Sequence, residues 1–413
     1  MTRKGAFAAL LLLLFPSPVL AQGFSGYVEA KGFAFAERES DRDPWVLGWS
    51  TLFAKGERKL GDAQFTASVR AEEISSQERG PLVFDPADRE ARRSPLSVRD
   101  LWVRLPLSST LDLQLGRFEL GWGKTDGYSP ADAFLPRDLS DPFLDEKLPI
   151  WAARLNGQKG PLRVDAVACP VTTPWRLPVL GGRNAPLETG SPFGRIRFED
   201  RENAPPRAGF VALRLLATIG DWDVGGWGRF GVRPAPLLRF RPDLAFPAPS
   251  GPTVPVDRRY AREEAAGVEV SRVAGSWVLR GEAAALFSDD PDLGDALIGT
   301  ISAERGFGDG TLLVTLAGNA KDTPVDPALL FDRALLPALI AAWNRTEAWG
   351  DWKVVWTEGL KHGDGLLKAE VGYNATDVWR LTLGGELPFG SEKGPLGALH
   401  AARRAHLAVR RSW

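Results

Sequence analysis

The sequence predicts an all-β fold, namely a closed antiparallel transmembrane β-barrel of about 16 strands (range about 14–18) with an inward-folded loop and a short loop helix. Three observations predict it. Segments of about ten residues alternate apolar with polar side chains, and the connections between them are alternately short and long. The chain also begins like an exported protein, and no later apolar run approaches the length of a spanning helix.

Residues 1–21 predict a secretory signal peptide. Arg3 and Lys4 precede an apolar run from Ala6 to Phe15, and the stretch ends in Val19-Leu20-Ala21, which fits the cleavage site of a secretory signal. A helix that spans a bilayer needs about 20 apolar residues, so this run is too short to be one. We therefore expect a mature chain near Gln22 and a single domain over residues 22–413.

Composition excludes several classes of function. Lys and Arg number 51 against 52 Asp and Glu, which gives a net charge of -1. A nucleic-acid-binding protein usually carries a basic stripe, and because none is visible we expect no nucleic-acid partner. Cys169 is the single cysteine, so an intrachain disulfide framework or a cysteine zinc cluster is excluded. We expect no cofactor.

Strict alternation is clearest at 64–72, 111–116, 162–168, 367–374 and 379–386. A soluble antiparallel sheet alternates too, so the choice of a barrel depends on further signs. The polar faces mix acids, bases, Gly and Thr, as a lumen does. Tryptophans near segment ends suit the aromatic girdles of a membrane barrel: Trp45, Trp49, Trp151, Trp222, Trp227, Trp277, Trp352, Trp356 and Trp379.

The last segment ends on Trp413, in phase with Leu407 and Val409. Outer-membrane barrels end in a similar way, with an aromatic residue on the strand that the assembly machinery reads. This pattern predicts two partners, the lipid bilayer and the outer-membrane assembly machinery.

Strands are predicted at 24–37, 45–56, 62–74, 96–106, 110–118, 149–157, 161–170, 206–218, 220–232, 261–273, 275–287, 296–305, 310–319, 348–360, 364–376, 377–388 and 399–413. This is an odd number, which would leave the C-terminus on the wrong side of the membrane. We therefore expect sixteen strands, with eighteen as the alternative. Closure is required because lipid cannot satisfy an open sheet edge.

The long connections are expected to be loops, including the Pro-rich stretches 171–206 and 233–256. The link from Asp326 to Trp343 differs, because Leu329, Leu330, Leu336, Leu339 and Ile340 can share one helical face after an Asp-Pro start. It predicts a short helix in an outer loop or plug, with a strand as the alternative.

Residues 118–149 are predicted to form the inward-folded loop. They begin after Gly116-Arg117 and contain Trp122-Gly123, Asp126-Gly127 and Pro136-Arg137-Asp138-Leu139, and a Pro-Ile-Trp strand start follows. This succession resembles the porin-like outer-membrane barrels near the alginate-export family over about forty residues. The resemblance implies a conduit for a solute.

The loop mixes charges of both signs, and three interpretations remain open. A constriction would select solutes by charge and size, whereas the acids could instead cap turns and brace the wall. A calcium site is the third, although the spacing lacks a regular ligand pattern. The constriction candidates are Arg117, Lys124, Asp126, Asp132, Arg137, Asp138, Asp141 and Asp145.

Inward-facing charges on the strands are candidates to line the lumen, or else only to pair across neighbouring strands. They are Arg154, Arg163, Asp165, Arg280, Glu282, Lys368, Glu370 and Arg380.

Catalysis has little support in the sequence. A Ser-His-acid site would need one of His362, His400 and His406 beside a serine of an adjacent strand. The sequence therefore favours a non-enzymatic channel of the bacterial outer membrane, monomeric or trimeric, for passive or facilitated passage of a small or oligomeric solute. A barrel-embedded hydrolase and a structural or adhesive barrel are the alternatives.

Overall fold

The computed structural model describes residues 23–38, 43–75, 94–132, 134–144, 146–186, 197–201, 206–241, 253–320 and 335–413. The predicted signal peptide, Asp145 and the first part of the predicted loop helix, 326–334, lie outside these ranges.

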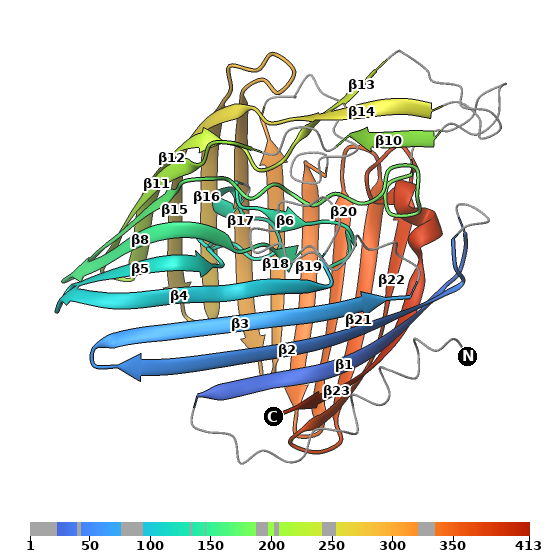
Figure 1. The fold of residues 1–413 in the computed structure, drawn as a ribbon, viewed down its shortest axis with the longest axis horizontal. Helices are drawn as coiled ribbons and strands as arrows, with labels where there is room; N and C mark the ends of the chain where they lie inside the picture. Colours follow the sequence, from blue (N-terminus) through green and yellow to red (C-terminus); the bar gives the residue numbers. More distant parts are fainter. Residues whose placement is uncertain are drawn as a thin grey trace.

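An 18-stranded antiparallel sheet closes on itself, because the first strand β1 pairs with the last strand β23 from Tyr27↔Ser412 to Phe35↔Arg404. Figure 1 shows the two side by side. The strands are β1 (Phe24–Phe35), β2 (Val46–Leu60), β3 (Ala63–Ile74), β4 (Leu96–Ser108), β5 (Leu111–Phe118), β8 (Ile150–Lys159), β9 (Leu162–Cys169), β11 (Phe210–Ile219), β12 (Trp222–Val232), β15 (Arg262–Ala274), β16 (Trp277–Phe287), β17 (Ala296–Phe307), β18 (Gly310–Asn319), β19 (Ala338–Glu347), β20 (Gly350–Gly359), β21 (Asp364–Asn374), β22 (Trp379–Gly390) and β23 (Arg404–Ser412).

The connections differ at the two ends of the barrel. At the end that holds Gly23 and Trp413, short turns join the strands, and glycines with positive φ begin several of them. Gly61, Gly160, Gly220 and Gly275 have φ of 60°, 59°, 58° and 62°. This left-handed conformation favours glycine, and its twist matches that of the flanking strands. We call this the turn end, and the other end the loop end.

The count of 18 corrects the expectation of sixteen, and the additional strand is β19. Part of the link predicted as a helix is this strand, which pairs with β18 and β20. Ala338 and Ile340 are buried toward the inside, while the alternate Leu339 faces outward. Both faces are apolar here, so the period of two is hidden, and a short apolar run cannot be distinguished from a helix by its pattern.

Two further features differ from the prediction. The last strand begins at Arg404, because residues Gly397–Ala402 form the 3₁₀ turn η3. The stretches expected to be loops contain a small sheet at the loop end, in which β14 (Thr253–Arg259) pairs with β10 (Arg197–Arg201) and β13 (Leu237–Phe240).

The outer face of the barrel is apolar along most strands. Val268 and Ile301, for example, are 62% and 63% exposed, and their neighbours in sequence face inward. Trp49 and Trp227, expected in the girdles, instead face the interior. Trp49 lines an internal cavity and Trp227 packs in the core with 5% exposure.

Residues 119–149 connect β5 to β8, and we call them the inner segment. They contain the 3₁₀ turn η1 (Pro130–Asp132) and the strands β6 (Arg137–Asp138) and β7 (Glu146–Lys147), which pair with each other. Trp122 and Phe134 of the inner segment belong to one buried cluster with small wall residues such as Ala284 and Ala317. Small side chains on the inner wall leave the space that these rings fill.

No helix within the described part of the chain is long and apolar enough to cross a membrane.

Candidate functional site

Glu282 of β16 is the wall residue that holds the first half of the inner segment. Its Oε1 accepts hydrogen bonds from Lys124 N at 2.6 Å, Thr125 N at 2.7 Å and Thr125 Oγ1 at 3.0 Å. Its Oε2 accepts from Ser129 Oγ at 2.7 Å and Ala131 N at 3.2 Å. Hydrogen bonds to a buried carboxylate are stronger than those between neutral groups. The segment is therefore wrapped around one charged group of the wall.

Asp132 shapes the segment from within. Its Oδ1 accepts from Trp122 N at 2.8 Å and Gly123 N at 3.0 Å, and its Oδ2 pairs with Lys147 Nζ at 2.6 Å. A Cβ at Gly123 would lie 2.4 Å from Ser129 Oγ and 2.7 Å from Asp132 Oδ2, so only glycine fits. Asp132 thus joins the start and the end of the segment.

Trp122 connects the segment to the wall at β8 and β9. Its indole Nε1 donates to Asp165 Oδ2 at 2.9 Å. Arg154 donates to both oxygens of the same carboxylate, from Nε at 2.8 Å and from Nη2 at 2.6 Å. Phe134 lies edge-on to Trp122, with ring centroids 5.8 Å apart, and 5.4 Å from Trp227. The contact is therefore polar at the indole nitrogen and aromatic on the ring face.

Arg404 of β23 binds the segment on another part of the wall. Its Nη1 and Nη2 donate to Asp141 Oδ2 and Oδ1 at 2.7 and 3.1 Å, and its Nε donates to Glu386 Oε2 at 2.9 Å. Nearby, Lys368 Nζ donates to the carbonyl of Phe143. The two parallel hydrogen bonds between Arg404 and Asp141 fix the orientation of the Asp141 carboxylate as well as its position.

Three further ion pairs, made by two carboxylates, hold the later part of the segment. Glu146 Oε1 lies 2.5 Å from Arg70 Nη1 and 2.9 Å from Arg99 Nη2, on β3 and β4. Asp138 pairs at 2.5 Å with Arg176, which lies in the connection after β9, and both side chains are buried. The inner segment therefore contacts walls far apart around the barrel.

Several predicted constriction residues have other surroundings. Lys124 Nζ reaches Ser271 Oγ at 3.4 Å. Asp126 lies 3.7 Å from Arg280, whose Nη1 pairs more closely with Glu304 at 2.7 Å. Arg117 is fully buried and its Nε donates to Val98 O at 2.7 Å.

Arg137 of β6 lines a cavity of about 210 Å³ between the inner segment and the wall from β19 to β21. Lys368, Ile340 and Leu366 line its wall side. Space therefore remains beside the inserted chain at this wall.

Three predicted lumen residues lie apart from the contacts of the inner segment. Arg163 is exposed beside the turn at 160–161. Arg380 pairs with Asp351 at 2.7 Å close to the turn end. Glu370 lies 3.4 Å from His406 Nε2.

Arg99, Arg176 and Arg404 are contact residues that the sequence analysis missed. Arg404 stands in the inward phase of the last strand, opposite Phe35 in the register, and this phase was the available signal. Arg176 lies between strands and carries no pattern of its own.

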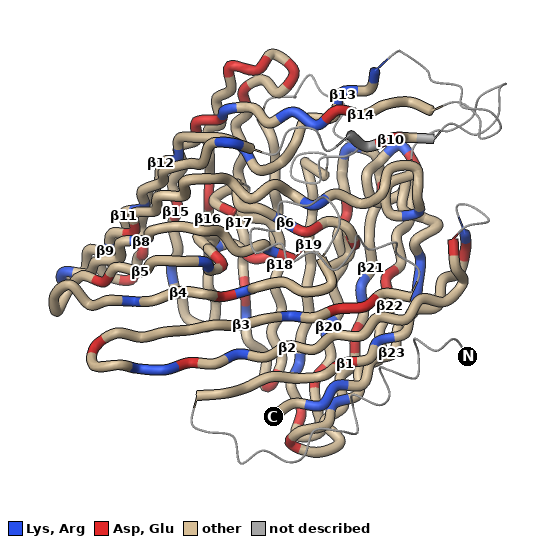
Figure 2. The backbone as a smooth tube through the Cα atoms, viewed as in Figure 1, with Lys and Arg blue, Asp and Glu red and all other residues tan. Residues whose placement is uncertain are grey.

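Charges of both signs are interspersed over the barrel (Figure 2). In the described ranges no group of three or more His, Cys, Asp or Glu side chains is arranged to hold a metal ion. His406 contacts Glu370 and Glu386, each at 3.4 Å, and no serine is among its polar contacts within those ranges.

No protein-family model matches the chain, and no curated protein matches it in sequence. Among solved structures, a mutant of the Rh. blastica porin is similar to it, with 9% identity, coverage of 94% of this chain and 99% of the porin, and a TM-score of 0.45. A loop-deletion mutant of OmpT, an outer membrane protein of Vibrio cholerae, has 10% identity, coverage of 94% and 98%, and a TM-score of 0.44.

Proposed function

We propose that this protein is an outer-membrane channel through which a small or oligomeric solute passes passively or by facilitated diffusion, and that the inner segment narrows its lumen. The observation that carries the proposal is the attachment of the inner segment to the inner wall through charged groups. Glu282, Arg404 and Arg70 of the wall hold one connecting segment against three parts of the same barrel.

The surface of the barrel supports a place in lipid. A ring of exposed apolar residues around a monomer in water would far exceed the patches that soluble proteins expose. In a bilayer the same residues face lipid, and the closed sheet leaves no unpaired edge. We assign the turn end to the periplasm, since bacterial barrels have short turns there and longer loops outside.

The mixed charges of the inner segment support selection by size and local field more than by net charge. Most of its carboxylates are already paired, as Asp132 is with Lys147 and Asp141 with Arg404. A constriction built in this way is rigid and nearly neutral. The resemblance of its motifs to barrels near the alginate-export family also supports a conduit.

We also propose that Trp413 belongs to the strand read by the assembly machinery. Its backbone is fixed by hydrogen bonds in both directions with Gly26, at 3.1 and 3.3 Å. A monomer and a trimer both agree with this geometry.

Planar-bilayer recordings of the purified full-length protein test the proposal. We expect stable conductance steps in salt solution. A folded barrel that never conducts and instead hydrolyses an ester or lipid substrate would replace the channel with a barrel-embedded hydrolase. Heat-modifiable gel mobility after detergent extraction checks the barrel independently, and solubility without detergent would contradict the membrane location.

A further inference from the structure

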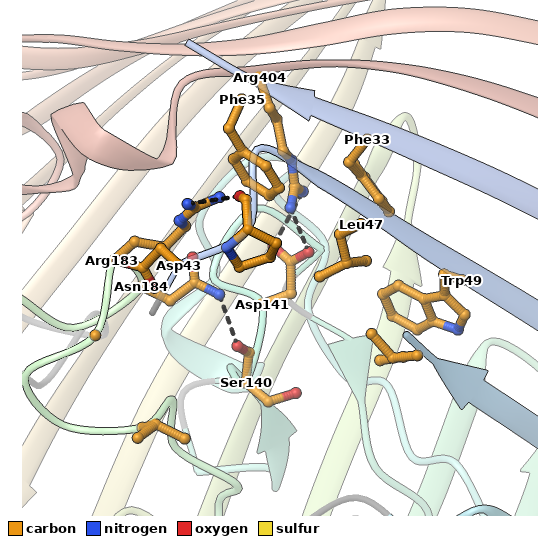
Figure 3. Close-up of a pocket in the computed structure, with 14 residues that line it drawn as sticks. Phe33, Phe35, Asp43, Leu47, Trp49, Ser140, Asp141, Arg183, Asn184 and Arg404 are labelled. Carbon is orange, nitrogen blue, oxygen red and sulfur yellow. Dashed lines mark hydrogen bonds and ion pairs between the residues drawn. The ribbon is translucent and has the colours of Figure 1, made fainter. Parts of the chain in front are cut away.

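A cavity of about 200 Å³ lies near the loop end, between the barrel wall and two stretches that pack inside it. Figure 3 shows aromatic side chains on the wall side and polar side chains across from them. Val179 at its rim is 78% exposed, which places one side of the cavity at solvent. The wall side of the cavity is lined by Phe33, Phe35 and Trp49, and the inner side by Ser140, Arg183 and Asn184.

Arg183 is buried here without a full set of acceptors. The residue is 7% exposed, and its guanidinium lies 3.7 Å from the ring centroid of Phe35. Nη2 donates to Pro44 O at 3.0 Å. Nε and Nη1 are buried and have no acceptor among the residues that the structure describes. A buried donor without an acceptor is costly, so these two nitrogens favour a ligand that accepts hydrogen bonds.

Asn184 supplies the opposite kind of group. Its Nδ2 donates to Ser140 O at 3.1 Å, which fixes the orientation of the amide. Its Oδ1 is buried and receives no donor from the described part of the chain. Two adjacent residues that line one small cavity thus carry unsatisfied donors and an unsatisfied acceptor. A hydroxyl group can satisfy both kinds, because it donates one hydrogen bond and accepts others.

The charges around the cavity disfavour an anion. Arg404 also lines it, but its guanidinium is engaged by Asp141 and Glu386 at 2.7 and 2.9 Å. Burial lowers the pKa of Arg183, and the carboxylate of Asp43 acts in the opposite direction. Each cation on the lining therefore already has a carboxylate near it.

The apolar side and the size of the cavity restrict the ligand further. Phe33 and Trp49 have ring centroids 6.3 Å apart and form, with Phe35, an aromatic wall. Sites for drug-sized ligands measure about 300–1,000 Å³, and this cavity is smaller. It suits one ring with a C–H face for the aromatics and hydroxyls at its edge.

We propose that this cavity is a binding site for one ring of a neutral polyhydroxylated solute, that is, a sugar, with Arg183 and Asn184 taking its hydroxyls and Phe33, Phe35 and Trp49 its apolar face. The proposal names a solute class for the channel and so rests on the proposed function. It adds a recognition step on the loop side of the inner segment.

Isothermal titration of the detergent-solubilised full-length protein with methyl glucoside tests the site, and methyl glucuronide, which keeps the ring and adds a carboxylate, serves as the charged counterpart. We expect saturable binding of the glucoside and at least tenfold weaker binding of the glucuronide. The substitution Arg183→Gln should weaken glucoside binding about tenfold, as expected when hydrogen bonds to a charged group are lost. Arg259→Gln, which changes an exposed arginine of the same end, should leave binding unchanged.

A second variant keeps the test decisive if Arg183→Gln fails to fold. Leu47→Trp places a larger side chain in the cavity from β2 and should abolish glucoside binding while heat-modifiable mobility persists. Absence of glucoside binding to the wild type, tighter binding of methyl glucuronide, or full binding by Leu47→Trp would overturn the proposal. A wild type that conducts without binding glucoside refutes this site alone, whereas one that binds without conducting refutes the channel.

Discussion

Glu282→Gln is the substitution that most directly loosens the inner segment. It preserves the shape of the side chain but replaces one carboxylate oxygen with an NH₂ group. If that group takes the Oε2 position, the Ser129 hydroxyl can turn to accept from it, but the Ala131 N–H loses its acceptor. The remaining hydrogen bonds from Lys124 and Thr125 lose the negative charge that strengthens them. A hydrogen bond to a charged group contributes about 1.5–3 kcal/mol. We therefore expect the substitution to cost about 3 kcal/mol of the free energy that holds the inner segment in place.

A loss of that size lowers the ratio of seated to released segment about 100-fold. The single cysteine reports it, because Cys169 is 3% exposed and belongs to the same buried cluster as Phe134 and Trp122. We expect a maleimide to label Cys169 slowly in the wild type and up to about 100-fold faster in Glu282→Gln.

The matched control is Glu29→Gln, since Glu29 pairs at 2.7 Å with Arg410 of the neighbouring strand. It should label at the wild-type rate. Equal labelling of Glu282→Gln and the wild type, with both proteins folded by heat-modifiable mobility, would refute the role of Glu282 as the anchor of the segment.

Three other substitutions probe separate contacts. Arg404→Gln leaves Asp141 and Glu386 buried without their cation, so the barrel should lose about 3–5 kcal/mol of stability. It should then unfold at a lower temperature in a heat-modifiability series. The control Arg410→Gln changes a half-exposed ion pair and should cost less than about 1 kcal/mol. Gly123→Ala forces Ser129 and Asp132 apart and should speed Cys169 labelling, whereas Gly121→Ala, whose Cβ would lie 3.5 Å from Lys147 Nζ, should not. Asp165→Asn removes the negative charge that balances Arg154, so the reversal potential in a salt gradient should shift toward anion selectivity. An unchanged reversal potential would place this ion pair outside the conduction path.

Alternation predicted most of the wall, because side chains of a two-sided strand meet different surroundings at every step. On β16, for instance, the apolar Leu279 faces outward and is exposed, whereas the charged Glu282 faces inward and is buried. The prediction was wrong at β19, where packing against the inner segment makes the inward face apolar as well. Ile340 lies close to Gly127, and a Cβ on that glycine would be 3.1 Å from the isoleucine.

The partners of the inner segment were beyond sequence reasoning for a different reason. Glu282 and Thr125 are separated by 157 positions, and only closure of the barrel brings them together. Sequence patterns identify which residues face inward, but the choice of partner depends on the path of the segment across the interior. Trp49 and Trp227 were expected at the lipid boundary because tryptophans are common in the girdles of membrane barrels. A tryptophan can also face the interior, where the path of the inner segment decides what it packs against.

Single-channel conductance of the wild type against a variant that lacks residues 126–145 is the most direct test of the central claim, that the inner segment narrows the lumen. The deletion removes the contacts with Arg404 and Arg176 and those of Ser129 and Ala131 with Glu282, while it leaves the wall strands intact. The account predicts a larger conductance per step for the deletion variant at equal salt. Equal conductance, with both barrels heat-modifiable, would contradict it.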